Sequence, residues 1–358
     1  MERHPLEHLT PDDIVLDAIP DDVEEAIHAR NTWLNSLRDN ADGLEFIVSD
    51  VRRWVPGQNV RVAFLGGSTK LHQDIVDTTK EITDACNIRL DFGLDANRGG
   101  SFRTWSTADV DHTAEIRVRF DQAGYYSLVG IDSVDANIGL PKSLTGGRPG
   151  QCSLNLGGFA VSRPENWRGV VRHEFLHALA FLHSHQNMRG PCEAAFRWED
   201  DQGYESTKNA NGAFVTDAAG RRPGIYTYLS GYPNFWNKKK VDRNLRTEED
   251  ATAVAGPFDR ASVMLYRFCP LFYKCPQTDC APSGDGISLS EGDKRGLQLL
   301  YPYGTPEIAA VIEKKGVILS MLEGEIVPEG LEARQPNRQS DFAPNLARVL
   351  RRSLRANS

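Results

Sequence analysis

Five residues near the middle of the chain have the types and spacing of a metal site. They read His173-Glu174-Phe175-Leu176-His177, with the two histidines four positions apart. In a helix this spacing places both imidazoles on one face, with their Cβ atoms about 5–6 Å apart. Both rings could then bind one Zn²⁺ ion at about 2.0–2.1 Å, and Glu174 would lie where it can take a proton from a water molecule. The pattern predicts one catalytic zinc ion.

The residues around this motif favour a helix. Apolar residues recur at helical spacing between Val170 and Phe181, and two alanines add helix propensity. Burying two histidines and a glutamate in an apolar helix is costly unless they have partners. The composition of the helix therefore favours a metal site over a chance occurrence of the five residues.

The identity of the third ligand decides the class of site. A catalytic zinc ion usually has three protein ligands and one open position. His183 follows His177 by six residues, and on a continuous helix it would lie about 9 Å further along the axis. It can be the third ligand only if the helix ends near Ala180 and the chain turns back.

The same stretch resembles the motif of the metzincin metallopeptidases, H-E-x-x-H-x-x-G-x-x-H. All four polar residues of that motif are present, and Ala180 stands at its glycine. A left-handed alanine costs on the order of 1 kcal/mol relative to glycine. Ser184 follows the third histidine, where astacins have Glu and matrixins have Asp. The resemblance implies that the three histidines bind zinc and that Glu174 is the general base.

A second segment resembles the astacins in particular. Ser262-Val263-Met264-Leu265-Tyr266 matches their Met-turn, S-x-M-H-Y, except that Leu265 replaces histidine. The resemblance implies that Met264 lies beneath the zinc ion, and that Tyr266 binds or flanks the ion and steadies the tetrahedral intermediate. On the residues alone, a methionine that fills a gap in the core and a core phenol remain open.

The order of landmarks between residues 52 and 303 resembles microbial astacin-like peptidases. Ser68 or Thr69 caps a predicted helix that runs to about residue 85, and a capping box at Ser290 begins a closing helix. We expect an α+β, zincin-like catalytic domain at 52–303, with a twisted mixed sheet, an active-site helix and a C-terminal subdomain that contains the Met-turn. Alternating apolar residues predict strands at 59–65, 87–92 and 114–120.

Residues 121–164 are rich in Gly, Pro and Asn, which predicts mostly loop with a short strand at 152–158. In metzincins the matching segment is an exposed antiparallel edge above the zinc ion, where a peptide substrate adds by main-chain hydrogen bonds. The resemblance assigns substrate binding to Leu154, Asn155 and Leu156. An ordinary hairpin strand is the alternative.

Both ends of the chain lie outside this domain. Residues 1–50 are acidic and favour helix, most clearly at 21–37. They could be a prosegment that covers the zinc ion, but we expect a docking helix that only adds stability. Residues 304–358 predict a helix and then a basic tail. A short amphipathic helix at 345–354 could bind a partner, but we expect a mobile, solvated tail.

Composition narrows the class of partner. The 358 residues carry a net charge of −8, which argues against nucleic acid as the main partner, and the absence of a run of 18 apolar residues predicts no membrane span. The polar first ten residues predict no secretory signal, whereas the resemblance suggests secretion.

None of the six cysteines forms C-x-x-C, which argues against a zinc ribbon and leaves disulfides and free thiols both open.

These patterns favour a zinc-dependent endopeptidase that acts on protein or peptide substrates. Two alternatives remain. A thermolysin-like zinc peptidase would take its third ligand from a carboxylate such as Glu193 or Glu199, with His183 incidental. A non-catalytic peptide-binding module would keep the fold without turnover, and the departures at Ala180 and Leu265 leave room for it.

Overall fold

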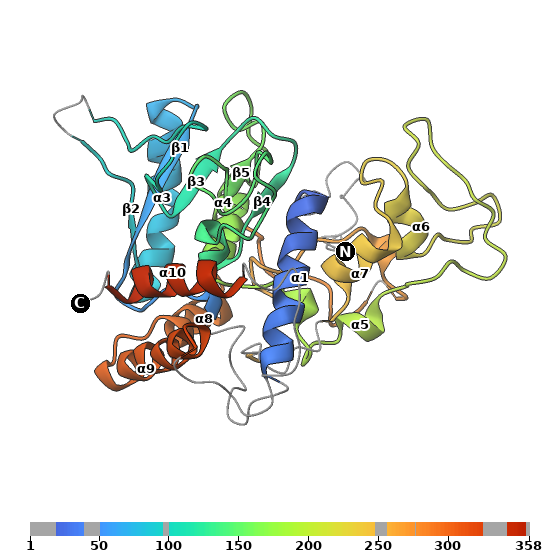
Figure 1. The fold of residues 1–358 in the computed structure, drawn as a ribbon. Coiled ribbons are helices and arrows are strands. Elements are labelled where there is room, and N and C mark those ends of the chain that lie inside the picture. The colour runs from blue at the N-terminus through green and yellow to red at the C-terminus, as the bar shows by residue number, and fades with distance from the viewer. Residues whose placement is uncertain are drawn as a thin grey trace. The chain divides into compact units, whose positions relative to one another are not determined.

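The computed structural model describes residues 19–38, 51–95, 100–247, 256–275, 277–324 and 342–355 (Figure 1). These residues form two compact units. Within the described ranges, we call residues 19–182 together with 287–355 the sheet unit, and residues 183–286 the aromatic unit.

A five-stranded mixed sheet is the centre of the sheet unit (Figure 1). Its strands are β1 (Asn59–Leu65), β2 (Arg89–Asp91), β3 (Ile116–Arg119), β4 (Tyr125–Ser127) and β5 (Leu154–Leu156). They lie in the order β2-β1-β3-β5-β4, and all pairs are parallel except β4 with β5. The alternating apolar residues Val60, Val62 and Phe64 share one face of β1 and are fully buried. The three predicted strands are confirmed as β1, β2 and β3.

The strand predicted at 152–158 is present as β5, but its expected place at the sheet edge is wrong. β5 pairs with β3 on one side and with β4 on the other, so both of its sides are hydrogen-bonded. The three residues Leu154, Asn155 and Leu156 are fully buried. The chain returns at 125–127 and adds β4 outside β5. Strand β4 has only three residues, which is too short to show an alternating pattern, so the sequence predicted a loop at this position.

Three helices of the sheet unit lie where the sequence predicts helices. They are α3 (Thr69–Ala85), α4 (Trp167–Ala178) and α8 (Glu291–Leu300), and α3 packs beside α4 (Figure 1). The Ser68 hydroxyl accepts a hydrogen bond from Leu71 N and caps α3. At α8, Ser290 and Asp293 form the predicted capping box. These caps satisfy amide groups that the first turn of a helix leaves without partners.

The first described helix, α1 (Asp21–Arg38), docks on the sheet unit. Val23 is buried against Leu128 and Ile138, and the ring of Trp33 lies 5.5 Å from that of Phe342. The packing fits the expected docking helix. The rest of the predicted extension, at 1–18 and 39–50, lies outside the described residues.

The expectation of a mobile C-terminal tail is wrong for α10 (Phe342–Arg355), which packs against α9 (Thr305–Leu322). Arg352 of α10 forms an ion pair with Glu115 at 3.1 Å. The basic residues lie on one face of α10, and the other face is apolar enough to dock. The buried residues of α10 are Leu346, Ala347, Val349, Leu350 and Ser353. The earlier part of the tail, at 325–341, lies outside the described residues.

The aromatic unit contains short helices and, among its described residues, only isolated strand pairings such as Phe196 with Tyr273. Its elements are η5 (Ser184–Gln186), α5 (Cys192–Ala195), α6 (Ile225–Ser230), α7 (Lys238–Leu245) and η6 (Pro270–Phe272). Its core is a cluster of rings: Phe196, Trp198, Tyr228, Phe268, Phe272 and Tyr273. These rings pack with aliphatic residues such as Leu229 and Val241 in the same cluster.

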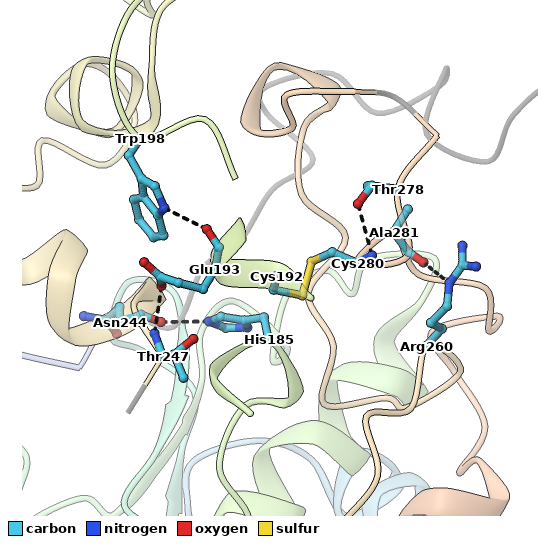
Figure 2. Close-up of a disulfide and its surroundings, with 10 residues drawn as sticks. All are labelled: His185, Cys192, Glu193, Trp198, Asn244, Thr247, Arg260, Thr278, Cys280 and Ala281. Carbon is cyan, nitrogen blue, oxygen red and sulfur yellow. Dashed lines mark hydrogen bonds between the residues drawn. A yellow bond between two sulfur atoms is a disulfide. The ribbon is translucent and has the colours of Figure 1, made fainter. Parts of the chain in front are cut away.

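A disulfide joins Cys192 to Cys280 within the aromatic unit (Figure 2). The other four cysteines are free thiols, and of these only Cys275 is exposed. Within the described ranges, every helix is too short or too polar to span a lipid bilayer.

Candidate metal centre

Helix α4 carries the first two candidate ligands on one face. His173 and His177 are both buried, their rings are 4.8 Å apart between centroids, and their Nε2 atoms are 3.2 Å apart. Two nitrogens bound to one tetrahedral zinc ion would be about 3.3 Å apart. The two rings therefore present their Nε2 atoms at the spacing that a shared metal ion requires.

The helix ends where the sequence motif needs it to end. Residue Ala180 is left-handed, with φ of 68°. Its N–H donates to His177 O at 2.8 Å, and Phe181 N donates to Leu176 O at 3.0 Å. This pair of bonds is the Schellman arrangement, in which the left-handed residue is usually glycine. The prediction that the chain turns at Ala180 is confirmed.

Side chains from distant parts of the sheet unit hold this helix end. The indole N–H of Trp54 donates to Ala178 O at 2.8 Å, and the hydroxyl of Tyr301 donates to Leu179 O at 2.9 Å. Carbonyl groups at a helix end need such partners when they are buried. The turn after α4 is thus fixed both by its own backbone bonds and by two buried aromatic residues.

The turn brings the third histidine to the first two. The ring nitrogens of His173, His177 and His183 all lie within 4.8 Å of one another. Three imidazoles are a donor set that suits zinc and leaves one position open. The alternative ligands do not join this group: Glu193 forms an ion pair with Arg246 and accepts from Thr247 N (Figure 2).

The orientation of His177 is set by the turn itself. Its Nδ1 lies 2.8 Å from the carbonyl oxygen of Phe181. Because a carbonyl can only accept, Nδ1 carries the proton, and Nε2 keeps the lone pair that a metal ion needs. Backbone contacts of this kind commonly orient metal-binding histidines.

Glu174 lies in the buried interior next to the histidines, with 1% of its surface exposed. Helix α4, which carries Glu174, contacts the edge strand β4, and burial together with the charge of Glu174 raises the pKa of the Tyr125 hydroxyl on that strand. Sequence reasoning missed Tyr125, because a residue in a three-residue strand carries no recognisable motif.

Within the aromatic unit, the ring of Tyr266 lies 4.4 Å from the ring of His183. Met264 is buried, and its carbonyl oxygen accepts from Ser184 N at 3.0 Å. The hydroxyl of Ser184 also donates to Ser262 Oγ at 3.0 Å. The segment 262–266 is therefore tied directly to the residue after the third histidine.

One further residue that packs against Tyr266 was not predicted from the sequence. His185 is buried, its Nε2 lies 2.8 Å from Asn244 O (Figure 2), and its ring stacks on Tyr266 at 5.1 Å. Since no motif includes it, only the three-dimensional packing reveals that it supports the ring of Tyr266.

The predicted substrate-binding residues Leu154, Asn155 and Leu156 do not form an open sheet edge, because β5 is paired on both sides. The side-chain amide of Asn155 donates to Gln122 O at 3.1 Å and to Gly124 O at 2.7 Å, so it holds the turn into β4. The outer side of the sheet above the histidines belongs to β4, the last strand in the order.

No protein-family model matches the chain, and no curated protein matches it. The solved structures that are similar to it include the following three. A structure of myroilysin has a TM-score of 0.47 and 24% identity, and the match covers 71% of this chain and 97% of that chain. A crystal structure of myroilysin has a TM-score of 0.40 and 22% identity, with coverage of 70% and 86%. High choriolytic enzyme 1, a hatching enzyme zinc-protease from Oryzias latipes (medaka fish), has a TM-score of 0.38 and 17% identity, with coverage of 71% and 96%. Because these TM-scores are below 0.5, the proposal below depends on the residues of the site.

Proposed function

We propose that this chain is a zinc-dependent endopeptidase of the astacin-like metzincin type, with a catalytic domain at 52–303. The observation that carries the proposal is the group of three histidines whose ring nitrogens lie within 4.8 Å of one another, next to the buried carboxylate of Glu174. A non-catalytic module would have no need of a buried carboxylate beside a three-histidine site.

In this proposal His173, His177 and His183 hold the ion. A zinc ion bound to three neutral imidazoles supplies Lewis-acid chemistry, namely a polarised carbonyl and a water molecule that loses its proton near neutral pH. Glu174 accepts that proton and passes it to the leaving amine. Tyr266, which lies against His183, donates a hydrogen bond to the developing oxyanion.

Met264 has a positioning role in this proposal. Its backbone is joined to Ser184 and Ser262 by hydrogen bonds of 3.0 Å, which supports its assignment as the methionine of a Met-turn. Leu265, at the position of the astacin histidine, is buried in the aromatic core. An apolar residue there keeps the turn packed without a polar partner.

We infer that a peptide substrate adds to β4 rather than to β5. Strand β4 (Tyr125–Ser127) is the last strand of the sheet order, so among the described strands none covers its outer side. An extended peptide can add to such an edge by main-chain hydrogen bonds. Tyr125 of β4, whose pKa is raised by burial and by the charge of Glu174, would then lie beside the bound substrate backbone.

The disulfide between Cys192 and Cys280 supports action in an oxidising compartment. The direct test of the proposed function is a casein assay on purified protein, with and without a chelator, together with zinc analysis. The proposal expects bound zinc and hydrolysis that the chelator abolishes. Bound zinc without hydrolysis would favour the binding module, and the absence of both would overturn the site.

A further inference from the structure

A buried ionic cluster connects helix α1 to the sheet unit. Arg30 of α1 is fully buried, and its Nη1 donates to Asp132 Oδ1 at 2.5 Å and to Asp135 Oδ2 at 3.2 Å. Both carboxylates are also fully buried. Arg52 Nε lies 3.9 Å from the second oxygen of Asp132. Two cations therefore face two anions in a region without solvent.

The charges of this cluster depend on one another. Burial raises the pKa of Asp135, and the charge of Arg30 opposes that rise. Burial would lower the pKa of Arg30, but attraction to Asp132 and Asp135 raises it. Removing one partner of a buried ion pair leaves an uncompensated charge, which is far more costly than the loss of a surface pair. As long as Asp132 and Asp135 are both present, Arg30 is therefore needed to compensate their buried charge.

The two carboxylates belong to a segment that touches the end of the metal helix. Asp132 lies in the 3-10 turn η4 (Gly130–Val134), all of whose residues are buried. A Cβ added at Gly130 would lie 2.0 Å from Arg52 O and 3.1 Å from the Cβ of Ala180. Because Gly130 leaves no room between η4 and the methyl group of Ala180, a shift of η4 is transmitted to the turn at Ala180.

Ala180 in turn determines the orientation of a metal ligand. Its left-handed backbone places the Phe181 carbonyl against Nδ1 of His177. The route from α1 to the site therefore passes through packed atoms only: Arg30 to Asp132, η4 to Ala180, and Phe181 to His177. All of these residues lie in the sheet unit.

We propose that Arg30 is a positioning residue for the metal site, and that α1 is a lasting part of the working enzyme rather than a removable inhibitor. Arg30 holds η4 against Ala180, and this contact keeps the Phe181 carbonyl where it orients His177. The effect of Arg30 on zinc binding rests on the proposed zinc function. The proposal assigns α1 a role in metal binding that docking alone would not give it.

The test uses the full chain with Arg30→Met, which keeps the apolar stem and removes the charge. Zinc affinity is measured by competition with a chromophoric chelator, and amide hydrogen exchange is measured at 177–183 in the metal-free protein. We expect zinc affinity to fall by about 10–100-fold, with faster exchange at Ala180 and Phe181. Excess zinc should restore kcat and leave KM unchanged.

Two further variants separate charge from packing. Arg30→Lys keeps one charge but cannot bridge both carboxylates as a guanidinium does, so its loss of affinity should be smaller. Arg30→Met combined with Asp135→Asn removes the uncompensated charge and should recover most of the affinity. Failure of this double variant to recover any affinity would overturn the electrostatic role.

The matched control is Trp33→Leu, which weakens the docking of α1 against Phe342 without touching η4. It should lower the melting temperature and leave zinc affinity within about twofold. An equal loss of affinity in Trp33→Leu and Arg30→Met, or unchanged exchange and affinity in Arg30→Met, would contradict the proposal. If the wild-type chain binds no zinc, the proposed function fails, while hydrogen exchange still decides whether Arg30 positions the turn.

Discussion

Nδ1 of His177 lies in hydrogen-bonding distance of the Phe181 carbonyl, at 2.8 Å, across the turn that ends helix α4. The turn exists because Ala180 adopts a left-handed conformation. One backbone feature therefore does two things: it redirects the chain so that His183 approaches the first two histidines, and it fixes which nitrogen of His177 can bind a metal ion.

Replacing Ala180 with glycine should stabilise the protein by up to about 1 kcal/mol, because a left-handed alanine is strained and glycine is not. The lost methyl group contacts Gly130 but is only partly buried, so little packing is lost. Chemical denaturation measures the change. Ala178→Gly, at the buried last residue of α4, is the control and should destabilise; equal destabilisation by both substitutions would contradict the role of the turn.

Replacing Glu174 with glutamine should lower kcat by about 10²–10⁴-fold, because the amide cannot accept a proton from the attacking water. Zinc content should stay at the wild-type level, since Glu174 is not a ligand in this site. Glu193→Gln is the matched control, because its carboxylate pairs with Arg246 and is not part of the three-histidine group. Full turnover in Glu174→Gln would remove the general-base assignment.

The stability of the sheet unit should fall in acid partly through His112. Burial, together with the charge of Arg117, lowers the pKa of His112 to about 4, whereas an unfolded histidine titrates near 6.5. Between these values the unfolded chain binds the extra proton, so lowering the pH from 7 to 4 favours unfolding, by about 1–3 kcal/mol. His112→Gln should reduce this acid loss, because glutamine can still donate to Gly147 O. Denaturation midpoints at pH 7 and pH 4.5 measure it, and an equal acid loss in both proteins would contradict the assignment.

Removing the disulfide should destabilise the aromatic unit. Cys192 and Cys280 are 88 positions apart, and closing a loop of that length stabilises by about 4–5 kcal/mol in the chain-entropy treatment. The double variant Cys192→Ser with Cys280→Ser should therefore show a lower melting temperature, in contrast to Cys275→Ser at an exposed thiol. A melting temperature unchanged in the double variant would show that the ring cluster alone holds this unit.

Local patterns predicted much of the fold correctly. Helices α3 and α8 carry their own capping residues, α4 carries helical spacing of apolar residues, and β1 and β3 carry clear alternation of apolar residues. The turn at Ala180 and the grouping of three histidines were also predictable, because the motif spans only eleven residues. In each of these cases the pattern that predicts the structure lies within one short, continuous stretch of sequence.

Features that depend on distant contacts were not predictable. Strand β4 has three residues and is recognisable only through its pairing with β5. The ion pair of Arg30 with Asp132 joins residues 102 positions apart, and neither segment has a motif that announces the other. The docking of α10 likewise depends on a surface formed by the folded sheet unit, so its charge pattern alone suggested a free tail.

The most direct test of the central claim is the zinc stoichiometry of the purified full chain, compared with that of His183→Ala and of His28→Ala, an exposed histidine on α1. The account predicts one zinc ion per chain in the wild type and in His28→Ala, and loss of tight binding in His183→Ala. A wild-type chain without zinc, or full zinc occupancy in His183→Ala at the same affinity, would contradict the proposed three-histidine site.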